Sequence, residues 1–384
     1  MKTTERKPPL TRFGEFELLK ALAILGLPAV HLIESALESN YASPGLTNFS
    51  SAIIGLCVFG PSVFMICMGF GLGGSRTSAV KTRQAGIQFL LIGALLNLIR
   101  WLLPGIICAA VVHTNLLNDI MFCLASDIYY FVGIYYIFYS FMKQWNVGTP
   151  ALLMISILML TVNTILTPFT HAHITDPIVS ALVGNIVYVD ETSCFPLLSW
   201  AIFPSVGILL GEILKKTDEE QRERFMRRIL DFSFVLFISL IVFFKAYDIN
   251  LLKVLVSPAN EYITDLPNVL ILLSLALFLI GLAYYLCKII GGSGFMKFVL
   301  RISAFIIPFY LLQWVLIAWI FYGMDLFRAP HGCFTVGWYI LCLIAVTGLC
   351  ILVTLKYGMK IMKWLLKITS FKKKKRKKKK DDKA

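Results

Sequence analysis

The sequence has very little charge for its length. Of its 384 residues only 15% are Asp, Glu, Lys or Arg, whereas 58% are hydrophobic and the mean hydropathy is +0.77. A soluble globular domain carries about 25% charged residues. The longest polar stretch, KKTDEEQRERFMRR at 215–228, is too short to form a domain of its own. This composition excludes a soluble enzyme and indicates an integral membrane protein.

The sequence also lacks the short motifs of several common enzyme classes. It contains no P-loop, no HExxH zinc motif and no nucleophile elbow. The glycine-rich stretch GFGLGGSR at 69–76 follows a hydrophobic segment rather than a β-strand, so it is not a dinucleotide-binding fingerprint. His171, His173 and Asp176 lie close together, but an H-x-H pair in a loop is weak evidence for a metal site. We therefore expect no metal.

Hydrophobic blocks of about 20 residues occur along the whole chain. At about 1.5 Å per residue, a helix of this length crosses a ~30 Å hydrocarbon core, and it is about twice as long as a strand of a membrane barrel. We predict an all-α polytopic membrane protein, a bundle of about ten transmembrane helices. The predicted spans are 16–36, 50–72, 85–111, 119–142, 150–170, 195–214, 229–247, 266–289, 298–322 and 334–355.

Lysine and arginine are distributed unevenly between the predicted loops. Of the 36 such residues, Lys245, Lys253 and Arg328 fall on one side and Arg100 falls inside a span, which leaves 32 on the side of the N-terminus. Because cytoplasmic loops carry the excess of Lys and Arg, this distribution predicts that both termini are cytoplasmic. The predicted location is the plasma (cytoplasmic) membrane, with the chain crossing it many times.

The chain divides into three predicted parts: a cytoplasmic N-terminal segment at 1–15, a transmembrane domain at 16–366 and a polybasic cytoplasmic tail at 367–384. The tail contains the run KKKKRKKKK, Lys372–Lys380. We expect it to attract the headgroups of anionic membrane lipids, by about 1 kcal/mol per charge near the surface. Nucleic acid is not an expected partner, because no aromatic-interleaved basic surface or recognition helix accompanies the run.

The first predicted span carries two polar side chains, Lys20 and His31. Eleven positions separate them, which is about 16 Å along a helix and within roughly 20° of the same face. Both side chains are therefore expected in one groove, with Lys20 at the cytoplasmic mouth and His31 in the outer half. The simpler interpretations are a Lys20 that extends to the headgroups and a His31 that makes an interhelical hydrogen bond.

Two further ionisable residues are predicted at similar depth on consecutive spans. Arg100 lies in a span that rises from the cytoplasm, and Asp127 lies in the span that returns. Charged groups within a membrane are costly, so they are usually paired or functional. One interpretation is a purely structural ion pair. The other is a constellation with His31, in which the neighbouring charges set the basicity of the imidazole.

Basic residues also follow the second predicted span. The glycine-rich stretch ends at Arg76, and Lys81 and Arg83 come shortly afterwards. Backbone N–H groups together with these cations would suit phosphate groups at the cytoplasmic mouth. The alternative is that the glycines only permit close helix packing and a turn.

Five segments in chain order resemble spans of a membrane acyltransferase superfamily, that of the acyltransferase family 3 enzymes and the heparan-α-glucosaminide N-acetyltransferase-like branch. The hallmark of family 3 is a basic residue, ten intervening residues and a histidine, matched here by Lys20 and His31. Lysine stands where the family usually has arginine, and Gln313 stands where many relatives have histidine. The segments are LLKALAILGLPAVHL (18–32), FGPSVFMICMGFGLGG (59–74), SDIYYFVGIYYIF (126–138), FPLLSWAIFPSVGILLGEIL (195–214) and RISAFIIPFYLLQW (301–314).

This resemblance implies that residues 16–366 form an acyltransferase-like domain. It implies transfer of an acyl group, expected to be acetyl, from cytoplasmic acyl-CoA to a hydroxyl or amine of an outward-facing glycan or lipid-linked acceptor. His31 would act as general base, Arg100 would stabilise negative charge on the thioester oxygen, and Asp127 would orient His31 or Arg100. The implied positions for the donor phosphates are Lys20, Arg76, Lys81 and Arg83, and those for the substrate are Trp200 and Gln313.

Two other functions fit a polytopic membrane protein with buried charges. The first is a transporter or flippase of an anionic lipid or glycan precursor, with Arg100 and Asp127 along its path. The chain shows no internal repeat of the kind that many transporters have, which disfavours this interpretation. The second is a non-catalytic partner in the assembly of the cell envelope.

Overall fold

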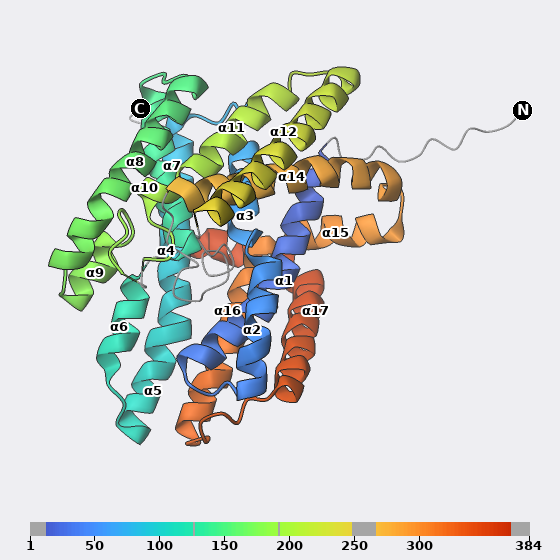
Figure 1. Cartoon of the computed structure of the whole chain (residues 1–384). Helices are drawn as coiled ribbons and strands as arrows, with labels where there is room; N and C mark the ends of the chain where they lie inside the picture. The colour runs from blue at the N-terminus through green and yellow to red at the C-terminus, as the bar shows by residue number, and fades with distance from the viewer. Residues whose placement is uncertain (1–12, 126, 191–192, 248–265, 370–384) are drawn as a thin grey trace, which may run out of the picture.

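The computed structural model describes residues 13–125, 127–190, 193–247 and 266–369. Within these ranges the chain is helical and forms no β-strand, apart from one isolated bridge between Ala42 and Phe334 (Figure 1). The helices are α1 (Gly14–Glu38), α2 (Pro44–Cys57), α3 (Gly60–Leu72), α4 (Ala79–Asn97), the π-helical turn η1 (Leu98–Leu102), α5 (Leu103–Val112), α6 (Leu116–Leu124), α7 (Ile128–Gln144), α8 (Thr149–His173), α9 (Pro177–Val183), α10 (Leu197–Trp200), α11 (Ile202–Leu214), α12 (Glu219–Ala246), α14 (Leu266–Ile290), α15 (Gly294–Ala304), α16 (Ile306–Leu326) and α17 (Val336–Ile368).

Ten helical segments of the described chain are long and apolar enough to cross a membrane. Each overlaps one of the ten predicted spans, so the predicted all-α polytopic bundle is confirmed, and the chain is a multi-pass membrane protein. Which membrane it occupies and on which side its ends lie stay predictions. So does the lipid binding of the tail, because Lys372–Lys380 lie outside the described residues, as do most of the N-terminal segment 1–15 and Lys253.

Three predicted span boundaries are wrong by eight or more residues. Helix α12 begins at Glu219 rather than near 229, because Asp218 caps a polar first part of the helix. Helix α16 begins at Ile306 rather than near 298, because the residues before it form the separate helix α15. Helix α17 continues to Ile368 rather than ending near 355.

The third span contains the π-helical turn η1, and Arg100 lies within it. Pro104 follows four residues after Arg100 and has no N–H to donate to that carbonyl. The backbone instead widens by one residue, and the N–H of Leu103 donates to the carbonyl of Leu98. The indole Nε1 of Trp319 donates to the carbonyl of Ile99 over 3.0 Å and ties this turn to α16.

The fourth span is interrupted, which differs from the continuous helix predicted at 119–142. Helix α6 ends at Leu124 and α7 begins at Ile128, with Asp127 as its N-cap residue. The carboxylate of Asp127 accepts a hydrogen bond from the N–H of Tyr129 over 2.9 Å. An acidic side chain at this position satisfies a free backbone donor and interacts favourably with the helix dipole.

Two glycines allow α3 and α11 to pack backbone against backbone. A Cβ atom at Gly69 would lie 2.0 Å from the carbonyl oxygen of Pro204, and one at Gly207 would lie 2.1 Å from that of Ile66. No larger residue fits at either position without a shift of the backbone. Close helix packing, one of the two interpretations of the glycine-rich stretch, therefore accounts for Gly69.

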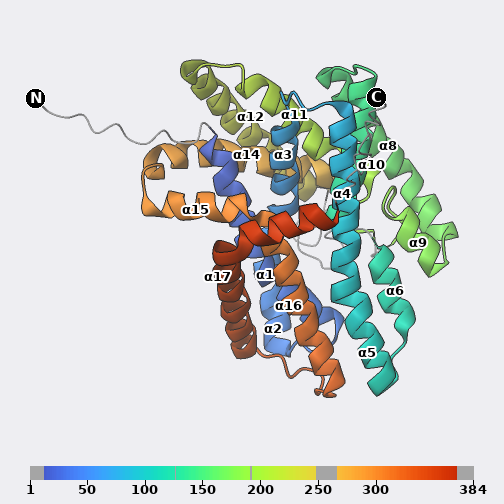
Figure 2. The same ribbon diagram turned by 180° about the vertical axis from the view of Figure 1, so that it is seen from behind.

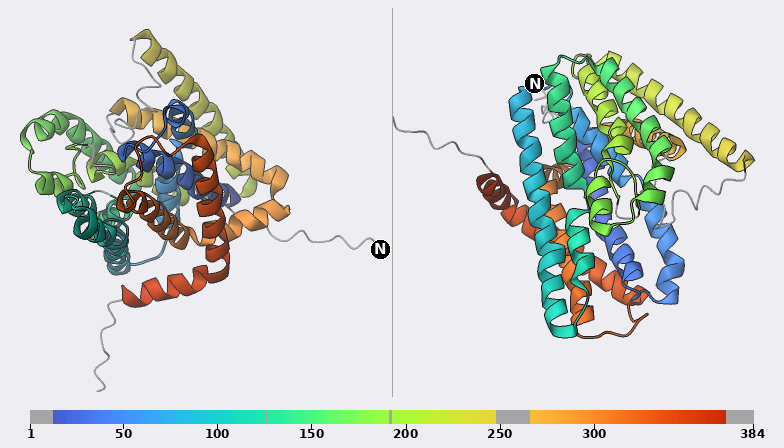
Figure 3. Two further views of the ribbon diagram at one scale, coloured as in Figure 1. Left: turned by 90° about the horizontal axis from the view of Figure 1, so that it is seen from below. Right: turned by 90° about the vertical axis from the view of Figure 1, so that its left-hand side faces the viewer.

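Helix α1 is the central element of the bundle. It packs against α2, α3, α14, α15, α16 and α17. Helix α14 runs crosswise to α4, α5 and α16, and α17 changes direction along its length (Figures 1, 2 and 3). This arrangement surrounds the face of α1 that carries Lys20 and His31.

Candidate functional site

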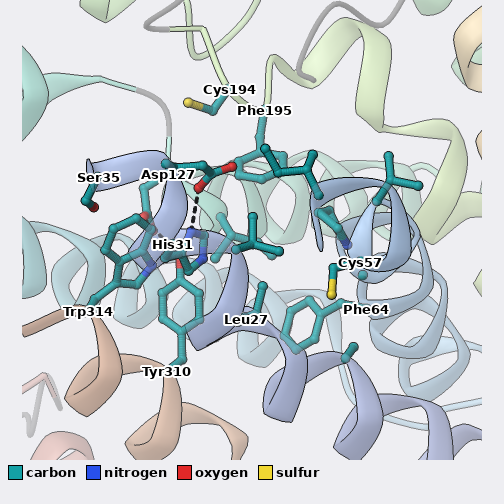
Figure 4. Close-up of a pocket in the computed structure, with 18 of the residues that line it drawn as sticks. Leu27, His31, Ser35, Cys57, Phe64, Asp127, Cys194, Phe195, Tyr310 and Trp314 are labelled. Carbon is teal, nitrogen blue, oxygen red and sulfur yellow. Dashed lines mark hydrogen bonds and ion pairs between the residues drawn. The ribbon is translucent and has the colours of Figure 1, made fainter. Parts of the chain in front are cut away.

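A cavity of about 290 Å³ lies beside the second half of α1. Its walls come mainly from α1, α2, α3, η1, the start of α7 and α16. His31, Arg100 and Asp127 all line it, although they come from three different spans. Figure 4 shows His31 and Asp127 among the lining residues. The structure therefore brings together the three residues predicted as catalytic.

The two ring nitrogens of His31 have different surroundings. Nδ1 lies 2.8 Å from Oε2 of Glu34, one helical turn further along α1, so that an Nδ1–H donates to the carboxylate. Nε2 is buried and has no hydrogen-bond partner in the part of the chain that the structure describes. A carboxylate on Nδ1 favours the tautomer whose Nε2 carries the lone pair. His31 is thereby arranged as a proton acceptor.

Arg100 is held from several sides. Its Nη2 lies 3.1 Å from Oδ2 of Asp127, which confirms the predicted ion pair. Its guanidinium lies over the rings of Trp314 and Trp101, at 4.3 and 5.0 Å from their centroids. Nε and Nη1 are buried and find no acceptor among the described side chains and backbone. The ion pair therefore leaves two donor groups of the guanidinium available.

Asp127 makes three contacts that fix its orientation. Besides the N–H of Tyr129 and the guanidinium of Arg100, the hydroxyl of Tyr310 donates to its Oδ2 over 3.2 Å. The sequence left open whether Asp127 would orient His31 or Arg100. In the structure it binds Arg100, whereas the carboxylate on His31 belongs to Glu34.

Trp314 lies between the base and the cation. Its ring centroid is 3.9 Å from that of His31, and the guanidinium carbon of Arg100 lies 4.3 Å from the tryptophan ring. A rigid indole in contact with both groups fixes their positions relative to each other. Figure 4 shows Trp314 and Tyr310 beside the imidazole.

The segment between α9 and α10 covers part of this cavity. Tyr188, Cys194 and Phe195 line it from there. The backbone of Tyr188 is held at both ends: its N–H donates to Oδ1 of Asn163 over 3.1 Å, and its carbonyl accepts from the hydroxyl of Thr170 over 2.6 Å. Burial raises the pKa of the Cys194 thiol, so this group stays neutral.

Lys20 lies in a second cavity, of about 410 Å³, and not in the one that contains His31. Its ammonium group is 2.8 Å from Oε1 of Glu17, and the hydroxyl of Ser303 donates to the same carboxyl group. The single groove predicted for Lys20 and His31 is therefore two cavities. They follow one face of α1, and about one helical turn separates Lys20 in one from Ala23 in the other.

The three cations predicted for donor phosphates lie outside the linings of both cavities. Arg76 and Lys81 are exposed near the start of α4, and the guanidinium of Arg83 lies 5.5 Å from the ring centroid of Phe141. Lys215 binds the carbonyls of Phe70 and Gly73 at this end of α3 instead.

The two predicted substrate residues have different positions. Trp200 lines the His31 cavity, and its buried Nε1 has no acceptor among the described residues. Gln313 is fully buried but is not part of the lining. Helix α16 instead contributes Trp314, the residue after Gln313, to the lining of the His31 cavity.

Three cavity residues were missed from the sequence: Glu34, Tyr310 and Trp314. The spacing of three between His31 and Glu34 is a signal that was available, because such residues are neighbours on a helix surface. Tyr310 and Trp314 belong to a span whose sequence is apolar all round, so no periodicity indicates which face meets α1.

The residues discussed as a possible metal site have other partners. Nδ1 of His171 and Nδ1 of His173 contact the carbonyls of Val189 and Phe169, and Asp176 caps α9. Compared with models of protein families, with curated proteins and with solved structures, the chain matches none. The functional interpretation therefore depends on the geometry of the cavities.

Proposed function

We propose that the protein is an integral membrane acyltransferase that moves an acyl group, expected to be acetyl, from acyl-CoA to a hydroxyl or amine acceptor. The observation that carries this proposal is the His31 cavity. It combines a histidine held by Glu34 with an arginine, and among the described residues neither Nε2 of the histidine nor Nε and Nη1 of the arginine has a hydrogen-bond partner. A base and an oxyanion-stabilising donor in one largely apolar cavity are what acyl transfer requires.

In the proposed reaction, Nε2 of His31 accepts the proton of the acceptor hydroxyl or amine. The acceptor oxygen or nitrogen attacks the thioester carbonyl, and negative charge develops on its oxygen, which Nε and Nη1 of Arg100 stabilise. The carbon–sulfur bond then breaks, and the CoA thiolate leaves with the proton held by His31. Glu34 stabilises the imidazolium that forms in between, and Asp127 and Tyr310 hold Arg100 in place.

The second cavity suits the donor's approach. Lys20 supplies a cation at one end of the α1 face, and the chain of the pantetheine arm would extend from there towards His31. About one helical turn of α1, between Lys20 and Ala23, forms a barrier between the two cavities. Helices α1 and α3 must therefore move apart locally for the thioester to reach the imidazole. The acceptor is proposed to be outward-facing, in a glycan or a lipid-linked molecule, and to enter at the Glu38 end of the His31 cavity.

The test is acetyl-CoA binding and turnover by detergent-purified protein, with wild type compared with His31→Ala. We expect both proteins to be stabilised by acetyl-CoA, because a ligand of the native state raises its stability. CoA release should be lost only in the variant. A folded wild type that does not bind acetyl-CoA, or a variant that turns over normally, contradicts the proposal.

Transport is the second candidate, and the barrier between the two cavities favours it. In alternating access a central site opens to one side of the membrane at a time, and a closed segment between two cavities would fit one such state. Counterflow of a labelled anionic lipid in vesicles, with no acetyl-CoA present, distinguishes this function from acyl transfer.

A further inference from the structure

Six cations gather on two helices that pack against each other, α15 and the C-terminal part of α17. We name this surface the basic collar. All six are exposed, and the collar consists of Lys297, Arg301, Lys356, Lys360, Lys363 and Lys367.

Helix α17 is longer than a membrane span. Its 33 residues measure about 50 Å, whereas a hydrocarbon core is ~30 Å thick. The first twenty or so residues suffice for crossing, and the lysines begin only after them, at Lys356. The last part of the helix turns away from the direction of the first (Figures 2 and 3). This part is therefore available to lie along the membrane surface.

The lysines occupy one face of that part. Their spacing of four, three and four residues places them within an arc of about 60°. Gly358 and Leu365 are buried and lie on the opposite face. At Gly358 a Cβ atom would be 2.8 Å from the ring of Phe305, so α17 packs tightly at the corner between α15 and α16. The protein thus orients the lysines outward.

Helix α15 repeats the pattern. Lys297 and Arg301 are four residues apart and exposed, whereas Met296, Val299 and Ile302 are buried. The same outward orientation therefore extends the collar onto a second helix.

Acidic residues are scarce in the sequence around the collar. The sequence has no Asp or Glu between Asp325 and Asp381. Among the described residues, no ion pair involves Lys297, Arg301, Lys356, Lys360 or Lys363. Exposed aromatic and apolar side chains flank the lysines, among them Tyr357 and Trp364. Such aromatic residues are typical of the membrane–water interface.

We infer that the basic collar binds the headgroups of anionic phospholipids. The charges would contact phosphate groups while Tyr357, Trp364 and the lysine stems pack among the upper acyl chains. A nucleic acid or an acidic protein would match the charge but would leave these apolar side chains in water. The inference is independent of the acyltransferase proposal, because none of the six cations lines either cavity.

The experiment measures lipid binding to the full chain purified in a neutral detergent, by titration with phosphatidylglycerol or phosphatidylcholine and native mass spectrometry. The test variant replaces Lys356, Lys360, Lys363 and Lys367 together by Gln, and the control replaces the same four by Arg. All proteins keep the tail, so its charges cannot explain a difference between them. Thermal unfolding in detergent confirms that each variant is folded.

We expect wild type and the arginine variant to bind phosphatidylglycerol at least ten times more tightly than phosphatidylcholine. The glutamine variant should bind phosphatidylglycerol at least about threefold more weakly than wild type and the arginine variant, because the contribution of the tail is the same in all three, and added salt should weaken the binding in wild type. A folded glutamine variant that binds phosphatidylglycerol as tightly as wild type overturns the inference. Displacement of phosphatidylglycerol by millimolar glycerol phosphate also overturns it, because the site would then recognise free phosphate rather than a lipid surface.

Discussion

At the scale of single residues, the environment of His31 distinguishes its two nitrogens. Glu34 lies 2.8 Å from Nδ1, and Trp314 covers the ring at 3.9 Å between centroids. A histidine with only a structural role normally uses both nitrogens in hydrogen bonds when it is buried. Nε2, which has no partner in the described part of the chain, is therefore the atom on which the proposed chemistry depends.

Replacing Glu34 by Gln tests this dependence. The amide still fills the space but carries no charge to stabilise an imidazolium, so we expect turnover to fall about 100-fold while acetyl-CoA binding changes little. The measurement is the steady-state rate of CoA release together with the thermal shift induced by acetyl-CoA. Glu220→Gln, at an exposed position on α12, is the control. Unchanged turnover in Glu34→Gln would show that this carboxylate does not assist His31.

The ion pair between Arg100 and Asp127 predicts an unequal response to single and double substitution. Asp127→Asn leaves the guanidinium buried without its counter-charge, so we expect a loss of about 3 kcal/mol in the free energy of unfolding. Arg100→Met with Asp127→Leu removes both charges and should recover most of that loss.

Unfolding of the purified variants, followed by circular dichroism in detergent and denaturant, measures both values. Equal destabilisation by the single and the double substitution would mean that the pair is not coupled. Turnover should be absent in the double variant even where stability is recovered, because Arg100 is then missing.

At the scale of helices, the site residues are positioned by close helix packing and by irregularities within the helices. Arg100 lies in a π-helical turn, and Asp127 is the N-cap residue before α7, at the point where the fourth span is interrupted. Both irregularities have local causes, the missing N–H of Pro104 and the capping carboxylate of Asp127. An uninterrupted helix through either residue would direct its side chain elsewhere.

The contact between α3 and α11 provides a matched pair of substitutions. Gly69→Ala places a Cβ atom against the Pro204 carbonyl, so we expect destabilisation by about 1–3 kcal/mol. Gly71→Ala, two residues further along the same helix, meets nothing within 4 Å and should be neutral or stabilising by up to about 1 kcal/mol. Melting temperatures in detergent report the difference. Similar values for the two variants would contradict the backbone contact.

At the scale of the whole molecule, two cavities lie in sequence along α1. If the donor's arm passes from the Lys20 cavity to His31, a bulky residue at Ala23 should block it. We expect Ala23→Phe to reduce acetyl transfer more than about tenfold, since the added ring fills part of a cavity of small volume. Ala151→Phe, at an exposed position on α8, is the control.

The Ala23→Phe variant also shows whether the donor is blocked between the two cavities or already at its entry into the Lys20 cavity. Adenosine 3′,5′-diphosphate lacks the pantetheine arm, so its stabilisation of Ala23→Phe should equal that of wild type. Loss of that stabilisation together with transfer would show that the substitution disturbs the Lys20 cavity itself. Normal transfer would show that the donor takes another path.

Much of the architecture followed from the sequence alone. Ten hydrophobic blocks predicted ten helices, because a chain in lipid must satisfy its own backbone hydrogen bonds. Arg100 and Asp127 were paired correctly from their depths, because length along a helix converts directly into distance across the membrane. Similar reasoning could have predicted the contact between Glu34 and His31, because residues three apart are neighbours on a helix surface.

Only the tertiary structure decided which faces of the helices meet. Helix α16 is apolar all round, so its sequence does not distinguish Trp314, which lines the cavity, from Gln313, which does not. The separation of Lys20 and His31 into two cavities depends on how α1 and α3 pack, and equal position on a helix face cannot reveal a barrier between side chains. Composition and span length are local properties of the chain, whereas a cavity is formed by residues that only folding brings together.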